Sequence, residues 1–192
     1  MPPLKPPLLC TDLSSCFIAN AAALDKRNIS ASVALCISDI TAIENQFTSL
    51  KTSVDGFTAS SGYVGLLSIH SKAQTVQSQL LKAGTDCCAV PTVISTEEND
   101  AILTALTTLV PDVEGAMVSF VTKKPVFQST LNGANAIKND IIAMHTKHTP
   151  LNTCFSSVIP PISIPEQGNL LGQIEDAYNY AEREYSNSPA TL

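Results

Sequence analysis

Hydrophobic side chains recur at helical spacing along most of the chain. Between residues 33 and 57 they return every three or four positions, the period of an amphipathic α-helix. The same period continues over residues 63–80, 102–120, 134–148 and 170–185. No stretch alternates long enough with the period of two that indicates a strand. The pattern therefore predicts an all-α protein, a five-helix up-down bundle with short loops.

Glycine, proline and capping residues predict where the first three helices end. Gly84 is expected to stop the second helix, which leaves residues 85–94 as a loop. Ser95 and Glu98 have the spacing of a capping box at the start of the third helix. Its hydrophobic stripe keeps its phase across Pro111, so we expect one long kinked helix rather than two.

Prolines also predict the ends of the third and fourth helices. The pair Lys123-Lys124 before Pro125 is expected to close the third helix, with its cations in the last turn. Pro150 is expected to stop the fourth helix, because proline lacks the backbone N–H that a helix interior needs. Residues 149–165 would then form a proline-rich connection to the last helix.

The first 27 residues differ from the rest of the chain. A small-x-small signal-peptidase pattern occurs at 19–21 and a dibasic pair at 26–27. We interpret residues 1–27 as a degenerate signal or pro segment; the alternative is a disordered arm. Cleavage would leave Asn28 in an N-x-S glycosylation acceptor at the mature N-terminus. The predicted domain boundaries are 28–187 for the helical bundle and 188–192 for a tail.

Charge and cysteine content narrow the range of partners. The net charge of −6 argues against nucleic acid and anionic membrane surfaces, which need a basic face. No apolar run approaches the roughly 20 residues of a transmembrane segment, so we expect none. Six cysteines among few charged residues are typical of a secreted protein with disulfide bonds.

No motif points to catalysis. The chain has no nucleophile elbow, phosphate loop, dinucleotide fingerprint or zinc-protease helix, so we expect neither an enzyme nor a cofactor. His145 and His148 stand three residues apart, but no carboxylate or cysteine accompanies them at metal-ligand spacing. We interpret both as ordinary helix residues and predict no metal site.

Three segments carry a resemblance to a known family. They read I-x-x-I to V-x-x-F over 40–57, L-x-x-L-x-x-L-V-P-D-V-E over 103–114 and F-V-T-K-K-P-x-F over 120–127. In this order the chain resembles the fungal hydrophobic surface-binding protein A family, also called cell-wall galactomannoproteins. The L-x-P-D-x-E and K-K-P-x-F segments are the most specific, and the resemblance covers about residues 28–187.

The resemblance implies a secreted fungal protein, extracellular or in the cell wall, that holds a fatty acid or similar amphiphile in its bundle. The alternative is a surface-adsorbing cell-wall structural protein that recruits secreted esterases to hydrophobic substrates. The chain has no long Ser/Thr-rich stalk or apolar C-terminal tail, which favours a released protein over a lipid-anchored one.

Composition favours an internal hydrophobic cavity. Aromatic residues make up only 5% of the chain and tryptophan is absent, so large side chains that could fill a wide interior are scarce. We expect mid-helix residues to line the cavity and the hydroxyl of Tyr178 to meet a carboxylate head group. The predicted lipid-binding residues are Phe47, Leu50, Val76, Leu106, Val113, Met117, Ile141, Met144, Ile174 and Tyr178.

An up-and-down path brings four cysteines to one end of the bundle. We predict that Cys36 and Cys154 each bond one of the adjacent pair Cys87 and Cys88, in either of the two arrangements. Bonded helices would hold this end shut. The opposite end, with Gly62, Lys123 and Lys124, is therefore expected to be the lipid entrance.

Overall fold

A computed structural model of the protein describes residues 29–90, 94–158 and 163–187. The predicted leader over 1–27, the acceptor Asn28 and the tail over 188–192 lie outside the described residues. Within the described part of the chain the regular structure is helical, as the hydrophobic period predicts.

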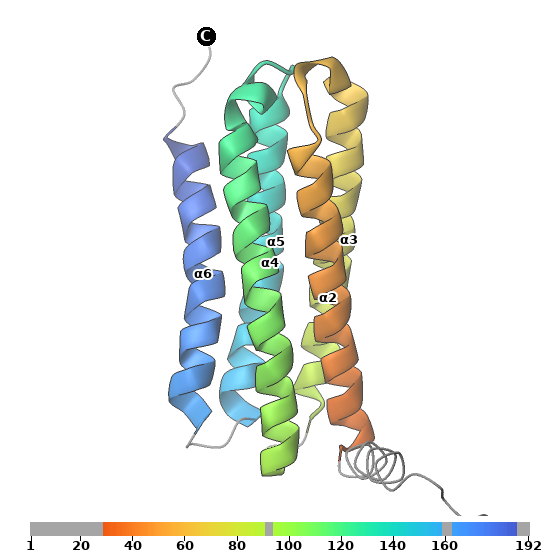
Figure 1. The fold of residues 1–192 in the computed structure, drawn as a ribbon, viewed down its shortest axis with the longest axis vertical. Coiled ribbons are helices and arrows are strands. Elements are labelled where there is room, and N and C mark those ends of the chain that lie inside the picture. Colours follow the sequence, from red (N-terminus) through yellow and green to blue (C-terminus); the bar gives the residue numbers. More distant parts are fainter. Residues whose placement is uncertain (1–28, 91–93, 159–162, 188–192) are drawn as a thin grey trace, which may run out of the picture.

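Five long helices run alternately up and down (Figure 1). Four of them, α2, α3, α5 and α4, form a ring in which neighbours pack side by side, and α6 lies outside this ring against α4 and α5. A short 3-10 helix, η1, precedes α3. The bounds are Ala31–Asp55 for α2, Ala59–Ser61 for η1, Gly62–Cys88 for α3, Thr96–Gln128 for α4, Gly133–Val158 for α5 and Ile164–Ser186 for α6.

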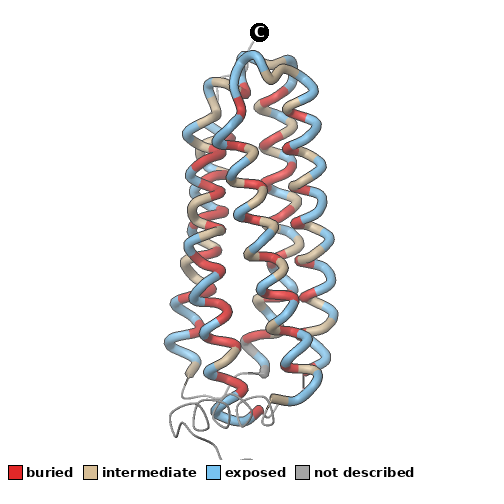
Figure 2. Tube along the Cα trace, turned by 45° about the vertical axis from the view of Figure 1, so that its right-hand side comes forward, coloured by how far each residue is buried: buried red, intermediate tan, exposed pale blue. Residues whose placement is uncertain are grey.

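The hydrophobic stripes face one another in a single core that runs the length of the bundle. Figure 2 shows buried positions recurring along the inward face of each helix. Burial of one Leu, Ile or Phe side chain contributes roughly 1.5–3 kcal/mol, so these stripes dominate the stability of the fold. The largest fully buried side chains are Phe47, Phe120, Phe127, Phe155 and Tyr178.

The predicted end of the second helix at Gly84 is wrong. Helix α3 continues through Gly84 to Cys88, so residues 85–88 are helical rather than part of a loop. A glycine inside a helix costs only about 1 kcal/mol relative to alanine. Burial of Cys87 and an ion pair between Lys82 and Asp86 at 2.8 Å stabilise the extra turn.

Two proline-based predictions are also wrong, although α4 is continuous through Pro111 as expected. Helix α4 includes Pro125 and extends to Gln128, so Lys123 and Lys124 are not in its last turn. An interior proline costs about 3 kcal/mol. Beyond Pro125, Phe127 is fully buried and stacks on Phe57 with ring centroids 4.6 Å apart, which offsets that cost.

Helix α5 likewise passes Pro150 and extends to Val158, where a loop was expected. Leu151 and Phe155 are 2% and 1% exposed in this extension. Their burial contributes about as much as the interior proline costs. The proline-rich connection is therefore shorter than predicted.

The capping box at the start of α4 is confirmed. The Glu98 N–H donates to Ser95 Oγ at 3.2 Å, and the Ser95 N–H donates to Glu98 Oε2 at 2.9 Å. The Ser30 N–H donates to Glu98 Oε1 at 2.8 Å, which joins the start of α2 to the start of α4. Hydrogen bonds from Ser30 and Ser95 lower the pKa of Glu98 to about 2.

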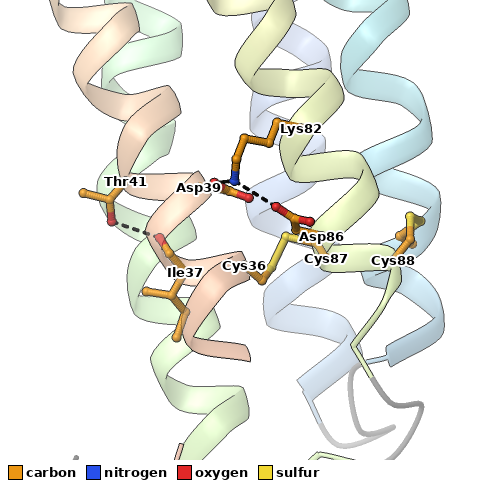
Figure 3. The surroundings of a disulfide bond; sticks show 9 residues. Cys36, Ile37, Asp39, Thr41, Lys82, Asp86, Cys87 and Cys88 are labelled. Carbon is orange, nitrogen blue, oxygen red and sulfur yellow. Dashed lines mark hydrogen bonds and ion pairs between the residues drawn. A yellow bond between two sulfur atoms is a disulfide. The ribbon is translucent and has the colours of Figure 1, made fainter. Parts of the chain in front are cut away.

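Two disulfide bonds lie at the end of the bundle that holds the α3 C-terminus (Figure 3). Cys36 bonds Cys87, with Cα atoms 4.7 Å apart, and Cys88 bonds Cys154, with Cα atoms 5.2 Å apart. Of the two arrangements left open by the sequence, this is the one present. The bonds link α3 to α2 and to α5, whereas α4 and α6 contain no cysteine.

Candidate hydrophobic ligand site

A small cavity lies where all five long helices meet. Its walls are almost entirely aliphatic and aromatic. All ten residues predicted to bind lipid are buried. Five of them line this cavity: Phe47, Leu106, Val113, Ile174 and Tyr178. The other five lie elsewhere in the core: Leu50, Val76, Met117, Ile141 and Met144.

The sequence-based prediction missed seven of the twelve residues that line the cavity. Leu151 and Phe155 were overlooked because the helix was expected to stop at Pro150. Leu171 stands three residues before Ile174, so a wider hydrophobic stripe on α6 would have included it. The full set of missed lining residues is Ile43, Leu80, Leu109, His148, Leu151, Phe155 and Leu171.

The structure does not show the wide internal cavity that composition predicts at this junction. The cavity present has a volume of about 10 Å³, close to the space of one water molecule. Pockets for small-molecule ligands usually measure about 300–1,000 Å³. An acyl chain can therefore enter this interior only if the helices separate.

Two polar side chains stand in the cavity wall without partners. Within the described residues, Tyr178 Oη and His148 Nδ1 have no hydrogen-bond partner, and the two ring centroids lie 5.7 Å apart. Burial lowers the pKa of His148 to about 4 and raises the pKa of Tyr178. Both groups are neutral at pH 7, so the interior offers hydrogen bonds but no charge.

A clamp of charged groups fastens α6 to α5 beside Tyr178. His145 contacts Glu175 through Nε2 at 2.9 Å and Glu182 through Nδ1 at 2.7 Å. Burial opposes protonation of His145, but the hydrogen bonds to both carboxylates outweigh it and raise its pKa. The imidazole also stacks on Tyr178 with centroids 4.9 Å apart. This histidine therefore helps to hold the outer helix against the ring.

Comparison with protein-family models shows which family the chain belongs to. The model for hydrophobic surface binding protein A matches residues 33–157, which is more than half of the chain and covers most of α2 to α5. The chain belongs to the hydrophobic surface binding protein A family. No curated protein matches this family member in sequence.

Three solved structures share the fold of this hydrophobic surface binding family member. AfMP4p in complex with palmitic acid matches with a TM-score of 0.75 at 20% identity, over 80% of this chain and 99% of that one. Ligand binding domain 2 of Penicillium marneffei MP1 protein, complexed with multiple arachidonic acids, matches with a TM-score of 0.70 at 14% identity, over 82% and 96%. A second structure of that domain with arachidonic acids has a TM-score of 0.69 at 14% identity, over 82% and 94%.

The end of the bundle that was expected to admit the ligand is tied together by hydrogen bonds. Lys123 Nζ donates to the carbonyl oxygen of Phe57 at 3.0 Å, and Lys124 Nζ donates to that of Glu184. Tyr185 Oη donates to the carbonyl oxygen of Phe120 at 2.8 Å. These bonds connect α4 to the loop after α2 and to the C-terminal end of α6, so the two lysines fasten this end.

Two further predictions concern a metal and a membrane span. Among the described residues, no group of three or more His, Cys, Asp or Glu side chains is placed to hold a metal ion. Helix α4 is long and apolar enough to cross a membrane, but 50% of its most apolar window is buried inside the bundle. Length and composition alone are weak evidence for a membrane span, because a buried core helix passes the same test.

Proposed function

We propose that this protein binds a long-chain fatty acid, or an amphiphile of similar shape, with the acyl chain between the helices. The observation that carries the proposal is the apolar interior at the junction of all five helices, where Tyr178 and His148 are neutral polar groups without partners among the described residues. Membership of the hydrophobic surface binding family and the two similar proteins solved with fatty acids support it.

Binding would proceed by separation of the helices around the cavity. The disulfide bonds hold α2, α3 and α5 together, while α4 and α6 take part in neither bond. Each methylene group that enters the interior contributes about 0.8 kcal/mol. A chain of about fifteen methylenes therefore gains on the order of 10 kcal/mol, which opposes the loss of contacts between helices.

A tryptophan scan of α4 tests the proposal. Val113 lines the cavity and is 1% exposed, whereas Val118 on the same helix is 52% exposed. Val113→Trp fills space that the acyl chain needs, so we expect at least a tenfold loss of palmitate affinity, equal to about 1.4 kcal/mol. Val118→Trp adds the same side chain to the surface and is expected to leave affinity unchanged.

Titration with a fluorescent fatty acid and native mass spectrometry would measure binding in both variants. Met117→Trp, at a buried position outside the cavity lining, checks whether any large core residue has the same effect. Circular dichroism verifies that each variant is folded. If folded Val113→Trp binds palmitate as well as wild type does, the acyl chain does not occupy this cavity.

A second function, adsorption to apolar solids, is favoured by one end of the bundle. Residues 56–71 and 125–137, which include the α2–α3 and α4–α5 turns, contain no Asp, Glu, Lys or Arg. Val64 is 79% exposed there and Leu131 is 84% exposed. The double variant Val64→Lys, Leu131→Lys is expected to adsorb several-fold more weakly to an alkane-coated surface while palmitate affinity stays the same. Equal adsorption of the variant and wild type would exclude this end as the contact.

We also propose a binding role without catalysis and an extracellular location, in the medium or the cell wall. The two disulfide bonds support the location, because such bonds persist in oxidising compartments. Glycosylation at Asn28 and recruitment of a secreted esterase remain predictions. Glycan analysis of the secreted protein and co-precipitation with an esterase would test them.

A further inference from the structure

A groove runs along α6 outside the cavity, and Asn152 of α5 borders it on the other side. It has a volume of about 260 Å³, far more than the closed interior. Leu171 lines both the groove and the cavity, so this one side chain forms part of the wall between them. The groove residues are Asn152, Ile164, Gln167, Gly168, Leu171, Gly172 and Glu175.

Two glycines keep the groove open. Gly168 and Gly172 stand one helical turn apart on α6, and a Cβ atom added at either would meet nothing within 4 Å. Packing against a neighbouring helix therefore does not require glycine at these positions. Their effect is to leave space on the α6 side of the groove, where any larger side chain would project.

Gln167 supplies a buried polar group in the groove wall. The residue is 2% exposed, and its Nε2 has no hydrogen-bond partner among the described residues. A buried donor without a partner is unfavourable and rare in proteins. The Nε2 atom is closed to solvent in this structure, so an acceptor reaches it once α5 and α6 move apart. Gln167 also stands one turn before Leu171, so the donor and the shared wall lie on the same side of α6.

We propose that Gln167 Nε2 binds the carboxylate of a fatty acid in this groove, and that the acyl chain passes Leu171 into the cavity. The inference rests on the fatty-acid binding proposed above and adds the position of the head group and the entrance. It places the entrance between α5 and α6 rather than at the end that holds Lys123 and Lys124.

The charges that face the groove are compatible with an anionic head group beside Gln167. Glu175 lies eight residues further along α6, about 12 Å away along the helix axis. Its Oε1 contacts His145 Nε2 at 2.9 Å, so its negative charge is countered from α5. Asn152 contributes an uncharged side chain from α5.

The groove also suits an ionised head group better than the inner wall does. The cavity beside Tyr178 has a volume of about 10 Å³ and no room for water around a carboxylate, whereas the groove has about 260 Å³. Gln167 and Tyr178 are eleven residues apart, about 16 Å along α6, a span comparable to an extended acyl chain. A fatty acid whose carboxylate lies in the groove can thus bring the end of its chain close to Tyr178.

A pair of ligands with matched chains tests the head-group contact. Gln167→Met removes the donor and keeps the side-chain length, so palmitate affinity should fall about tenfold. Hexadecyltrimethylammonium, used below its micelle concentration, has no hydrogen-bond acceptor, and its affinity should not change. Gln173→Met, on the same helix but outside the groove, should alter neither affinity. Palmitate affinity should fall further in Gln167→Met than in Tyr178→Phe, which removes the hydroxyl of the inner wall.

A second pair of variants tests the entrance. Gly172→Leu fills the groove and should slow the association of both ligands, measured by stopped-flow fluorescence, by at least about tenfold. Gly84→Leu makes the same change in α3, where an added Cβ also meets nothing within 4 Å, and should leave the rates unchanged. Thermal unfolding of both variants checks that the helices remain intact.

The outcomes separate the two proposals. If wild-type protein binds neither ligand, the proposed function itself is wrong. If wild type binds palmitate but Gln167→Met binds it equally well, or Tyr178→Phe reduces affinity more than Gln167→Met does, the carboxylate does not lie beside Gln167. If Gly172→Leu leaves association rates unchanged, the ligand does not enter between α5 and α6.

Discussion

His148 illustrates how burial determines the chemistry of a residue in this bundle. It stands on a hydrophobic stripe of α5, is 3% exposed and lines the cavity. The sequence predicted an ordinary helix residue rather than a metal ligand. The structure adds that burial lowers the pKa of the imidazole to about 4, so His148 is an uncharged part of an apolar wall at neutral pH.

The low pKa of His148 predicts a loss of stability in acid. The pKa falls from 6.5 in the unfolded chain to about 4 in the folded one, so the unfolded chain binds the proton first. The contribution is complete above about pH 6.5 and decreases by roughly 3 kcal/mol as the pH falls towards 4. Urea unfolding of wild type and His148→Leu at several pH values would measure it. A similar decrease in both proteins would contradict the prediction.

At the scale of single helices, the position of α6 is held by tertiary contacts with α4 and α5. The family model stops at residue 157, before α6 begins. Its attachment to α5 includes the contacts of His145 with Glu175 and Glu182, and no disulfide bond involves it. The attachment of α6 is therefore sensitive to the protonation of one side chain.

Raising the pH is expected to loosen α6. The folded pKa of His145 is raised above 6.5, so its contribution is complete below about pH 6.5 and is lost as the pH rises through the folded value. Hydrogen exchange, corrected for its intrinsic pH dependence, should show α6 amides less protected at pH 9 than at pH 6. His145→Gln should remove this difference while α2 remains unaffected. Equal protection of α6 at both pH values in wild type would exclude the clamp.

Element boundaries show where local signals are sufficient and where they fail. The hydrophobic period predicted all five helices, and the capping box predicted the start of α4. Gly84, Pro125 and Pro150 suggested ends that are wrong, because the penalty at each site is at most a few kcal/mol. Burial of Cys87, Phe127 and Phe155 beyond those sites offsets the penalty, and that burial depends on the neighbouring helices.

At the scale of the whole molecule, the two disulfide bonds divide the bundle into a linked part and an unlinked part. Helices α2, α3 and α5 form one covalently joined set at one end of the bundle, and α4 and α6 complete the core without cysteines. If the interior opens to a ligand, we expect α4 and α6 to move, because neither disulfide bond holds them.

Reduction of the disulfide bonds is expected to destabilise the protein strongly. The bonds close sequence separations of 51 and 66 residues, so each contributes roughly 4 kcal/mol in the chain-entropy model. Urea unfolding with and without a reductant should show a lower midpoint after reduction. The variant Cys88→Ala, Cys154→Ala should lose about half of the total effect. An unchanged midpoint after reduction would show that the bonds do not limit the unfolded chain.

Sequence reasoning sufficed for features that depend on residues close together along the chain. The stripes of α2 to α6 predicted the all-α class, because helical spacing and hydrophobicity are local properties. The up-and-down path predicted which cysteines meet, since helices of similar length return to the same end. The ten predicted lipid-binding residues are buried for the same reason, although their role in binding remains a proposal.

The tertiary structure decided which buried residues surround the cavity and where the interior is accessible. Val113 and Met117 are both buried on α4, yet only Val113 lines the cavity, because the lining depends on how five helices pack together. Gly168 and Gly172 stand out in the sequence, but the groove beside them depends on how α5 and α6 pack together. Packing geometry of this kind arises from contacts between distant residues, which hydrophobic spacing along one helix does not encode.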